Sequence, residues 1–267
     1  MQQTLMDNEA QGIPGALATP RTVHLSLQGK GGVGKSLIAS LLAQFHKARG
    51  VRAICVDTDP VNQTFSQYAA LGAQHLPLMD KNQLDRRRFD SLVDTILATD
   101  ESFIVDNGAS TFIPLWHYML EGAVTSVLRE GNRNLVIHTV ITGGQALGDT
   151  LLGFKSLAES CDSRCIVVWV NEYFGPVEKD GKTFSQMAAF IEHQDKVAGT
   201  VVIPRQSPDT FGRDFEEMIA RKLTFAEIAS ATGFTVMSKQ RLRMIQRYLF
   251  EQMDKLNLLQ ATLANGD

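Results

Sequence analysis

Residues 28–40 read QGKGGVGKSLIAS, and this stretch decides the fold. It follows an alternating apolar run at 23–27 and precedes apolar residues at helical spacing, so a glycine loop joins a predicted strand to a predicted helix. The spacing matches the pattern G-x-x-x-x-G-K-[ST], in which glycines let main-chain N–H groups face a phosphate group. A glycine-rich turn without a ligand would not need both this spacing and this context. The stretch therefore predicts a phosphate-binding loop.

Two lysines lie in this loop, and the general pattern explains one of them. Lys35 should reach the β- and γ-phosphates of a nucleotide, while the hydroxyl of Ser36 should bind Mg²⁺. The residues that we expect to contact the nucleotide are Gly29, Lys30, Gly31, Gly32, Val33, Gly34, Lys35, Ser36 and Leu37.

Short apolar runs alternate with amphipathic segments along the rest of the chain. This alternation predicts an α/β fold with a mostly parallel sheet, helices on both of its faces and a helical C-terminal subregion. We expect a flexible leader at 1–20, a nucleotide-binding core at 21–204 and a helical subregion of the same domain at 205–267. The predicted strands are 22–28, 52–57, 102–106, 134–141, 165–171 and 199–203. The predicted helices are 35–49, 62–71, 86–98, 112–130, 145–160 and 183–194.

The composition is that of a soluble globular protein. The 267 residues carry a net charge of -3, which does not favour a general nucleic-acid binder. No apolar run approaches the roughly 18 residues of a membrane span, and the first residues lack a signal-peptide pattern. The three cysteines have no metal-binding spacing, which favours reduced thiols and a cytoplasmic protein.

A carboxylate at the end of a later strand completes the expected magnesium site. The run SFIVD at 102–106 is an apolar strand ending in Asp106, which is typical of a Walker B motif that holds Mg²⁺ through water. The next residues read NGAS, where Gly108 would let the backbone approach the γ-phosphate. Alone this pattern is weak, but after a phosphate loop it is specific.

The run KGGVGKS at 30–36 resembles the deviant Walker A motif of the ParA/MinD superfamily. The resemblance implies that Lys30 reaches across an ATP-sandwiched homodimer to the phosphates of the partner subunit. There its ammonium would stabilise negative charge in the transition state. The alternative is a solvated loop lysine.

The same resemblance suggests roles for five further residues. Asp59 would orient the attacking water, which makes it catalytic together with Lys30 and Lys35, and Asp57 would support the Mg²⁺ shell. Both acids could instead cap a following helix. Asn171 would bind adenine, or it is simply a turn residue at a strand end. Pro204 and Arg205 would lie at the base pocket.

A narrower resemblance covers about 22–256 and points to the TraL-type conjugal-transfer proteins. It implies a cytoplasmic accessory ATPase of plasmid DNA transfer that uses ATP and Mg²⁺, hydrolyses slowly and has a conjugation or plasmid-maintenance protein as partner. The alternative is a plasmid partition or positioning ATPase that binds DNA or membrane as its ATP dimer. Switch II reads VDNGAS instead of the common Asp-Thr-Pro run, and its lack of cysteine excludes an iron–sulfur reductase. The runs that carry this resemblance are LQGKGGVGKS (27–36), DTDPVNQTF (57–65), VDNGAS (105–110), LVIHTVITGGQAL (135–147), TFGRDFEEM (210–218) and KQRLR (239–243).

The C-terminal segment 236–256 combines an apolar stripe at helical spacing with several Lys and Arg residues. Such a helix packs its stripe on the domain, or it lies on a membrane or on phosphates. Residues 224–242 also fit a helix-turn-helix motif, except that Lys239 occupies a position that should be apolar and buried. A lid or subunit-contact helix pair is the other interpretation of this segment.

Overall fold

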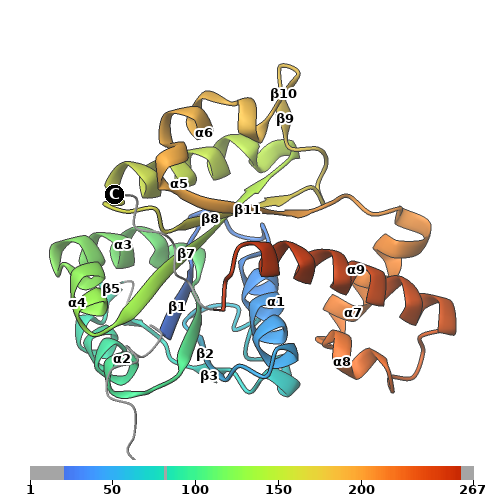
Figure 1. The fold of residues 1–267 in the computed structure, drawn as a ribbon, viewed down its shortest axis with the longest axis horizontal. Coiled ribbons are helices and arrows are strands. Elements are labelled where there is room, and N and C mark those ends of the chain that lie inside the picture. The colour runs from blue at the N-terminus through green and yellow to red at the C-terminus, as the bar shows by residue number, and fades with distance from the viewer. Residues whose placement is uncertain (1–20, 81–82, 260–267) are drawn as a thin grey trace, which may run out of the picture.

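Seven parallel strands form the central sheet in the part of the chain that the computed structural model describes, residues 21–80 and 83–259. Their order is β11-β8-β7-β1-β6-β2-β3 (Figure 1). All six predicted strands are confirmed, and the sequence missed only the short edge strand β3 of this sheet. The strands are β1 (Arg21–Ser26), β2 (Ala53–Asp57), β3 (Gln74–His75), β6 (Ser102–Asp106), β7 (Arg133–Thr142), β8 (Ile166–Asn171) and β11 (Val197–Ile203). Two small hairpins pair β4 (Met79–Asp80) with β5 (Gln83–Leu84) and β9 (Glu178–Lys179) with β10 (Lys182–Thr183).

Helices cover both faces of the sheet, as predicted (Figure 1). On one side lie α2, α3, α4, α5 and α6, and on the other lie α1, α7, α8 and α9. Neighbouring residues of β6 show how the faces divide, since Phe103 and Val105 join the first apolar cluster and Ile104 joins the second. The helices are α1 (Lys35–Ala48), α2 (Arg86–Ala98), α3 (Phe112–Glu121), α4 (Val124–Glu130), α5 (Leu147–Ser160), α6 (Ala188–His193), α7 (Arg213–Ala220), α8 (Phe225–Ile228) and α9 (Val236–Lys255).

Three helix predictions were wrong in part. The predicted helix 183–194 is a 3₁₀ turn at Phe184–Gln186 followed by α6, because Met187 between them has an extended backbone. Residues 62–71 form turns and one short 3₁₀ helix, Ala69–Leu71, and the carboxylate of Asp57 bonds the N–H of Ser66, which a helix over this range would use. The predicted helix 112–130 is two helices, since Ala123 adopts a left-handed φ of 47° between α3 and α4. The leader at 1–20 and residues 260–267 lie outside the described residues.

The carboxyl ends of β1 and β6 lie side by side at the centre of the sheet. Ser26, the last residue of β1, pairs with Asp106 on one side and with His138 of β7 on the other. The chain leaves β1 through the phosphate loop and leaves β6 through the predicted switch II. Two sequence motifs more than sixty residues apart therefore meet at one edge, where open α/β sheets bind ligands.

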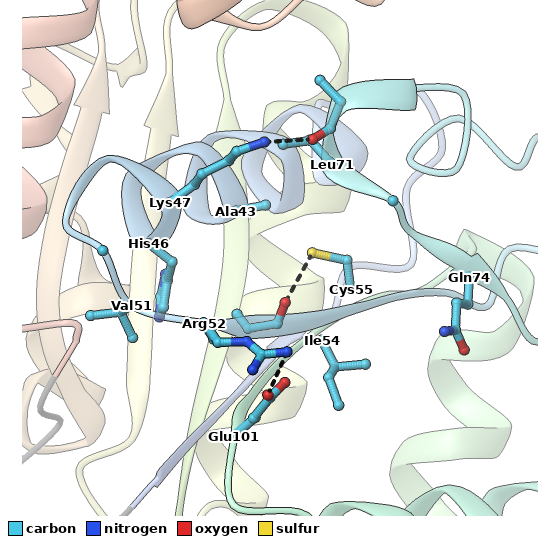
Figure 2. Close-up of a pocket in the computed structure, with 14 residues that line it drawn as sticks. Ala43, His46, Lys47, Val51, Arg52, Ile54, Cys55, Leu71, Gln74 and Glu101 are labelled. Carbon is cyan, nitrogen blue, oxygen red and sulfur yellow. Dashed lines mark hydrogen bonds and ion pairs between the residues drawn. The ribbon is translucent and has the colours of Figure 1, made fainter.

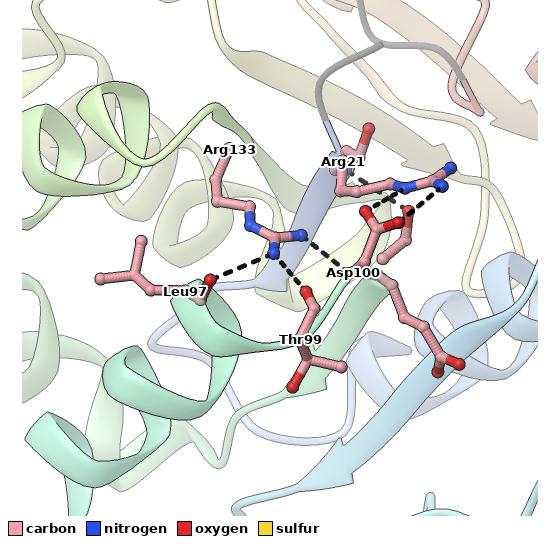
Figure 3. Close-up of polar contacts among 8 residues, drawn as sticks. Arg21, Leu97, Thr99, Asp100 and Arg133 are labelled. Carbon is pink, nitrogen blue, oxygen red and sulfur yellow. Dashed lines mark hydrogen bonds and ion pairs between the residues drawn. The ribbon is translucent and has the colours of Figure 1, made fainter. Parts of the chain in front are cut away.

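At the amino-terminal edge, arginines fix the strands to the loop after α2 (Figure 3). The guanidinium of Arg133 donates to main-chain oxygens of Leu97, Thr99 and Glu101, which closes the C-terminal end of α2. Arg21 of β1 pairs with Asp100, with 3.1 Å between Nε and Oδ1. These contacts hold the edge opposite the phosphate loop.

The outer edge of β11 is covered by α9. The side-chain amide of Gln252 accepts from the main-chain N–H of Val202 at 2.8 Å and donates to its carbonyl at 3.0 Å, so it replaces a neighbouring strand. Leu256 packs against Gly199, where a Cβ atom would lie 2.2 Å from its side chain. The predicted packing of the C-terminal apolar stripe on the domain is confirmed, because its residues are buried; they are Leu242, Ile245, Leu249 and Met253.

Candidate nucleotide site

The phosphate loop connects β1 to α1 and requires glycine at two positions. Gly32 has a φ of 74° and Gly34 a φ of 111°, which L side chains rarely adopt. Gly34 is also the N-cap of α1, where no side chain caps the helix and the first turn holds no acidic residue. The N–H groups and the positive end of α1 are therefore available to an anion.

Lys35 is buried against the loop instead of extending into solvent. Its side chain folds back so that Nζ donates to the main-chain oxygen of Lys30 at 3.1 Å. Burial lowers the pKa of Lys35, and the nearby carboxylates of Asp106 and Asp59 oppose that shift. A buried ammonium with a single carbonyl partner fits a ligand that carries negative charge.

Asp106 is the group that best fits a metal ion. It is fully buried, and neither carboxylate oxygen has a hydrogen bond of ordinary geometry to the described residues. Burial raises the pKa of Asp106 to about 7, while the Ser36 hydroxyl and the Lys35 ammonium act in the opposite direction. An unpartnered carboxylate beside a hydroxyl provides oxygen donors of the kind that Mg²⁺ takes.

Within the described residues, no three His, Cys, Asp or Glu side chains converge as a metal cage. Mg²⁺ at a nucleotide does not need such a cage, because it keeps water and phosphate oxygens and takes one or two protein ligands. The pair Ser36 and Asp106 is sufficient for that arrangement.

The two acids after β2 organise the loop that follows them. Asp57 accepts from the N–H groups of Asp59 and Ser66, at 3.1 and 2.9 Å. Asp59 accepts from those of Val61 and Asn62, at 2.9 and 3.2 Å. The structure thus places both acids at the carboxyl edge as predicted, with no α-helix for them to cap. Both bonds to Asp59 end on Oδ1, and Oδ2 accepts from Asn62 Nδ2 at 3.3 Å, so Oδ2 of Asp59 and both oxygens of Asp57 keep acceptor capacity. The catalytic role of Asp59 and the metal role of Asp57 stay predictions.

Switch II lies in direct contact with Asp59. A Cβ atom on Gly108 would lie 2.9 Å from both Cγ and Oδ1 of Asp59, so only a residue without a side chain fits. Asn107 is fixed instead by its side chain, which accepts from Thr58 Oγ1 at 2.8 Å and donates to the Ser26 carbonyl at 3.3 Å. Switch II (105–110) and the loop that carries Asp59, the predicted switch I, are therefore packed together.

Asn171 contacts the phosphate loop from the end of β8. Its Nδ2 donates to the carbonyl of Val33 at 3.0 Å. Pro204 and Arg205 follow Ile203 of β11, which pairs with Asn171, so the three predicted base-pocket residues lie near one another. Arg205 is exposed, and adenine binding by these residues stays a prediction.

The sequence analysis missed Asp149, which is the partner of Lys30. Their side chains form an ion pair with 2.8 Å between Nζ and Oδ2, and they are 44% and 55% exposed. Asp149 lies in the first turn of α5, after β7, and no local motif links it to the glycine loop. Only its place near the carboxyl end of a predicted strand could have suggested it.

A separate cavity of about 490 Å³ lies at the opposite edge, around the start of β2 and the end of α1 (Figure 2). Lys47 donates to the carbonyl of Ala70 at 3.0 Å, and Arg52 pairs with Glu101 at 3.1 Å. The cavity shares no lining residue with the phosphate loop.

In the described part of the chain, no helix has the length and apolar character needed to cross a membrane.

A model of the CobQ/CobB/MinD/ParA nucleotide binding domain matches residues 26–232, which include the loop, both switches and Asn171. The chain belongs to this MinD/ParA family. Two proteins named Protein TraL from Escherichia coli are 44% and 43% identical to it over 238 residues, which cover 89% of this chain and 99% of each relative. The MinC:MinD cell division protein complex of Aquifex aeolicus has a TM-score of 0.54 at 15% identity, with 86% of this chain and 96% of that chain covered. At 15% identity, this similarity shows that the two proteins share a fold and nothing further. As a MinD/ParA family member, the chain has a P-loop nucleotide-binding domain, and the predicted fold class is confirmed.

Proposed function

We propose that this chain is a cytoplasmic ATPase that switches between monomer and ATP-bound homodimer as an accessory protein of plasmid conjugal transfer. The observation that carries the proposal is the uncapped, glycine-rich start of α1 beside the buried, unpartnered carboxylate of Asp106. The similarity to two TraL proteins over nearly the whole chain supports the conjugal role and a protein partner from that system.

In this proposal, ATP binds with its phosphates over residues 29–37 and its base near Asn171, Pro204 and Arg205. Lys35 neutralises phosphate charge from within the chain. Ser36 and Asp106, with Asp57 behind them, hold Mg²⁺, which would supply positive charge to the phosphate oxygens. The residues of the chain supply positioning and charge, and little covalent chemistry.

Asp59 and Gly108 give the site a way to respond to the γ-phosphate. Asp59 holds switch I through main-chain N–H groups, and Gly108 of switch II touches its carboxylate. A change at one switch therefore displaces the other. Asp59 also orients the attacking water, and hydrolysis is slow because the site is completed only across the dimer.

Lys30 supplies the charge that crosses the dimer. Its ion pair with Asp149 is half exposed, and such pairs contribute about 0–1 kcal/mol, so exchanging Asp149 for a triphosphate of the partner subunit costs little. Assembly and nucleotide state then depend on one side chain. In the second candidate function, a partition or positioning ATPase, the same dimer would bind DNA or membrane; the basic residues of α9 favour DNA.

Size-exclusion chromatography with and without MgATP tests the dimer. Asp59→Ala should stay dimeric with ATP because it binds without hydrolysing, whereas Lys30→Ala should stay monomeric. The matched control is Lys155→Ala, since that lysine is 45% exposed and forms an ion pair with Glu159 on the surface of α5. Normal dimerisation and ATP turnover by Lys30→Ala would refute the role of Lys30. A monomeric Asp59→Ala with ATP would refute the sandwich dimer.

A further inference from the structure

Helices α7, α8 and α9 form a compact unit beside α1 (Figure 1). One buried apolar cluster joins them, with Phe215 of α7, Phe225 and Ile228 of α8, and Leu242 of α9. Phe234, from the connection between α8 and α9, is also buried in it. Two short helices that pack under the first half of a longer helix resemble a helix-turn-helix unit, although the connection at 229–235 is longer than the turn of about 3–4 residues in that motif.

The one residue that argued against this motif is accommodated by the structure. Lys239 is only half-buried, and its Nζ donates to the carbonyl of Ala229 at 3.0 Å, just beyond the end of α8. The turn is formed by Gly233, whose φ of 90° an L side chain would rarely adopt. Thr235 then caps α9 by accepting from the N–H of Ser238 at 3.1 Å.

The amino-terminal half of α9 presents an exposed, positively charged face. Val236 and Met237 are 82% and 60% exposed, and Gln240 is exposed one turn later. Between 236 and 250 there are four Lys or Arg residues and no acid. One of the four, Arg241, is taken by its ion pair with Asp214 at 2.5 Å.

Two arginines on this face are available to a ligand. Arg243 is exposed and forms no hydrogen bond or ion pair with the residues that the structure describes. Arg247 is 74% exposed and contacts Glu251 only at 3.8 Å. Because the chain as a whole carries a charge of -3, this positive surface is local and not a general property of the protein.

We propose that the amino-terminal half of α9 binds duplex DNA in the major groove. Arg243 and Arg247 contact phosphates, while Val236, Met237 and Gln240 face the base edges. This site is distinct from the nucleotide site; the proposal does not rest on the conjugal ATPase function, and it specifies the DNA contact of the second candidate function. A membrane is the poorer occupant, because the main apolar stripe of α9 is already buried against the domain.

Fluorescence anisotropy of the full chain with a labelled duplex of about 30 base pairs tests the proposal, since this length exceeds one major-groove site. The variant is Arg243→Glu with Arg247→Glu. The matched control is Arg87→Glu with Lys155→Glu, which also reverses one unpaired exposed arginine and one lysine or arginine in a helical ion pair. Both variants change the net charge equally, and Arg243→Gln is a milder third variant. Thermal unfolding and ATP binding show that each variant is folded.

The wild type should bind DNA at low salt. The α9 variant should bind at least about tenfold more weakly, because it loses phosphate contacts, and each lost contact should also make the slope of log K against log salt shallower by about 0.9. The control variant should bind like the wild type. Equal loss in both variants, or no binding by the wild type with ATP, ADP or no nucleotide, would overturn the proposal. The proposal would also be overturned if the α9 variant kept its DNA binding but lost a binding to anionic-lipid vesicles that the wild type shows, which would assign the face to a membrane.

Discussion

Gly108→Ala should disturb the contact between the two switches. Gly108 has a φ of -65°, which alanine adopts readily, so backbone strain does not contribute. The new methyl group would lie 2.9 Å from Cγ and Oδ1 of Asp59 and 3.2 Å from Cδ of Pro60, too close for either loop to stay in place. Overpacking of this kind costs about 1–3 kcal/mol, and the smaller entropy of the unfolded alanine chain offsets about 0.4–1 kcal/mol. We expect a net loss of about 1–2 kcal/mol in the free energy of unfolding.

The same variant should lose ATP turnover more than it loses ATP affinity. In the proposed function Asp59 orients the attacking water, so its displaced carboxylate would no longer do so, and a misplacement of about 1 Å in an active site costs on the order of 100-fold in rate. None of the three atoms nearest to the new methyl group belongs to the phosphate loop, so nucleotide affinity should change little.

Urea unfolding, steady-state ATP hydrolysis and nucleotide titration measure the three quantities. Gly148→Ala is the matched control, because a Cβ atom there meets nothing within 4 Å and the residue lies in α5. That control should be neutral or stabilised by up to about 1 kcal/mol. If Gly108→Ala matched the control in stability and turnover, the close contact between the switches would be wrong.

Two further predictions concern buried groups. His138 accepts from Trp169 and is 2.9 Å from His24; burial lowers the pKa of His138 to about 3 and that of His24 well below its ordinary value. The unfolded chain takes up a proton at each histidine below pH 6.5 and the folded chain does not, so each histidine should lower the free energy of unfolding by about 2 kcal/mol between pH 7 and pH 5. Asp106, whose pKa burial raises to about 7, takes up a proton in the folded chain over the same range and offsets about one histidine. Urea unfolding should therefore show a net loss toward pH 5, and a flat or rising profile would contradict this. The sulfurs of Cys161 and Cys165 are 3.0 Å apart, so hydrogen peroxide should oxidise the pair to a disulfide, with two waters formed and an intact mass lower by about 2 Da. Three thiols that persist after this treatment would contradict the prediction.

The sequence predicted the elements whose causes are local. Buried strands such as 102–106 are continuous apolar runs, and the loop at 29–36 has a spacing that few other structures need. Residues 62–71 have apolar residues at helical spacing too, but the carboxylate of Asp57 bonds the N–H of Ser66, a contact that a periodicity argument does not include.

Contacts between distant residues could not be predicted in this way. Lys30 meets Asp149 only because β1 and β7 are neighbours in the sheet, and that neighbourhood depends on topology. His24 and His138 look scattered along the chain for the same reason, although they are in contact in the core. Sequence patterns thus gave the edge at which the site lies, and the tertiary pairing gave the partners within it.

The contacts of the unit formed by α7, α8 and α9 limit the ways in which bound nucleotide can change DNA binding. Phe225 of α8 donates its N–H to Gln44 of α1 at 2.8 Å, and Gln252 of α9 pairs with the main chain of β11. Among the described residues, the unit is therefore fixed by direct contacts to α1, the helix that starts at the phosphate loop, and to the edge of the sheet. A hinge motion that exposes α9 would break both contacts. In the proposed ATP-bound dimer, two such faces would lie in one particle without either of them moving. The gain in DNA affinity with ATP should then come from the second face, through the higher effective concentration of a linked site.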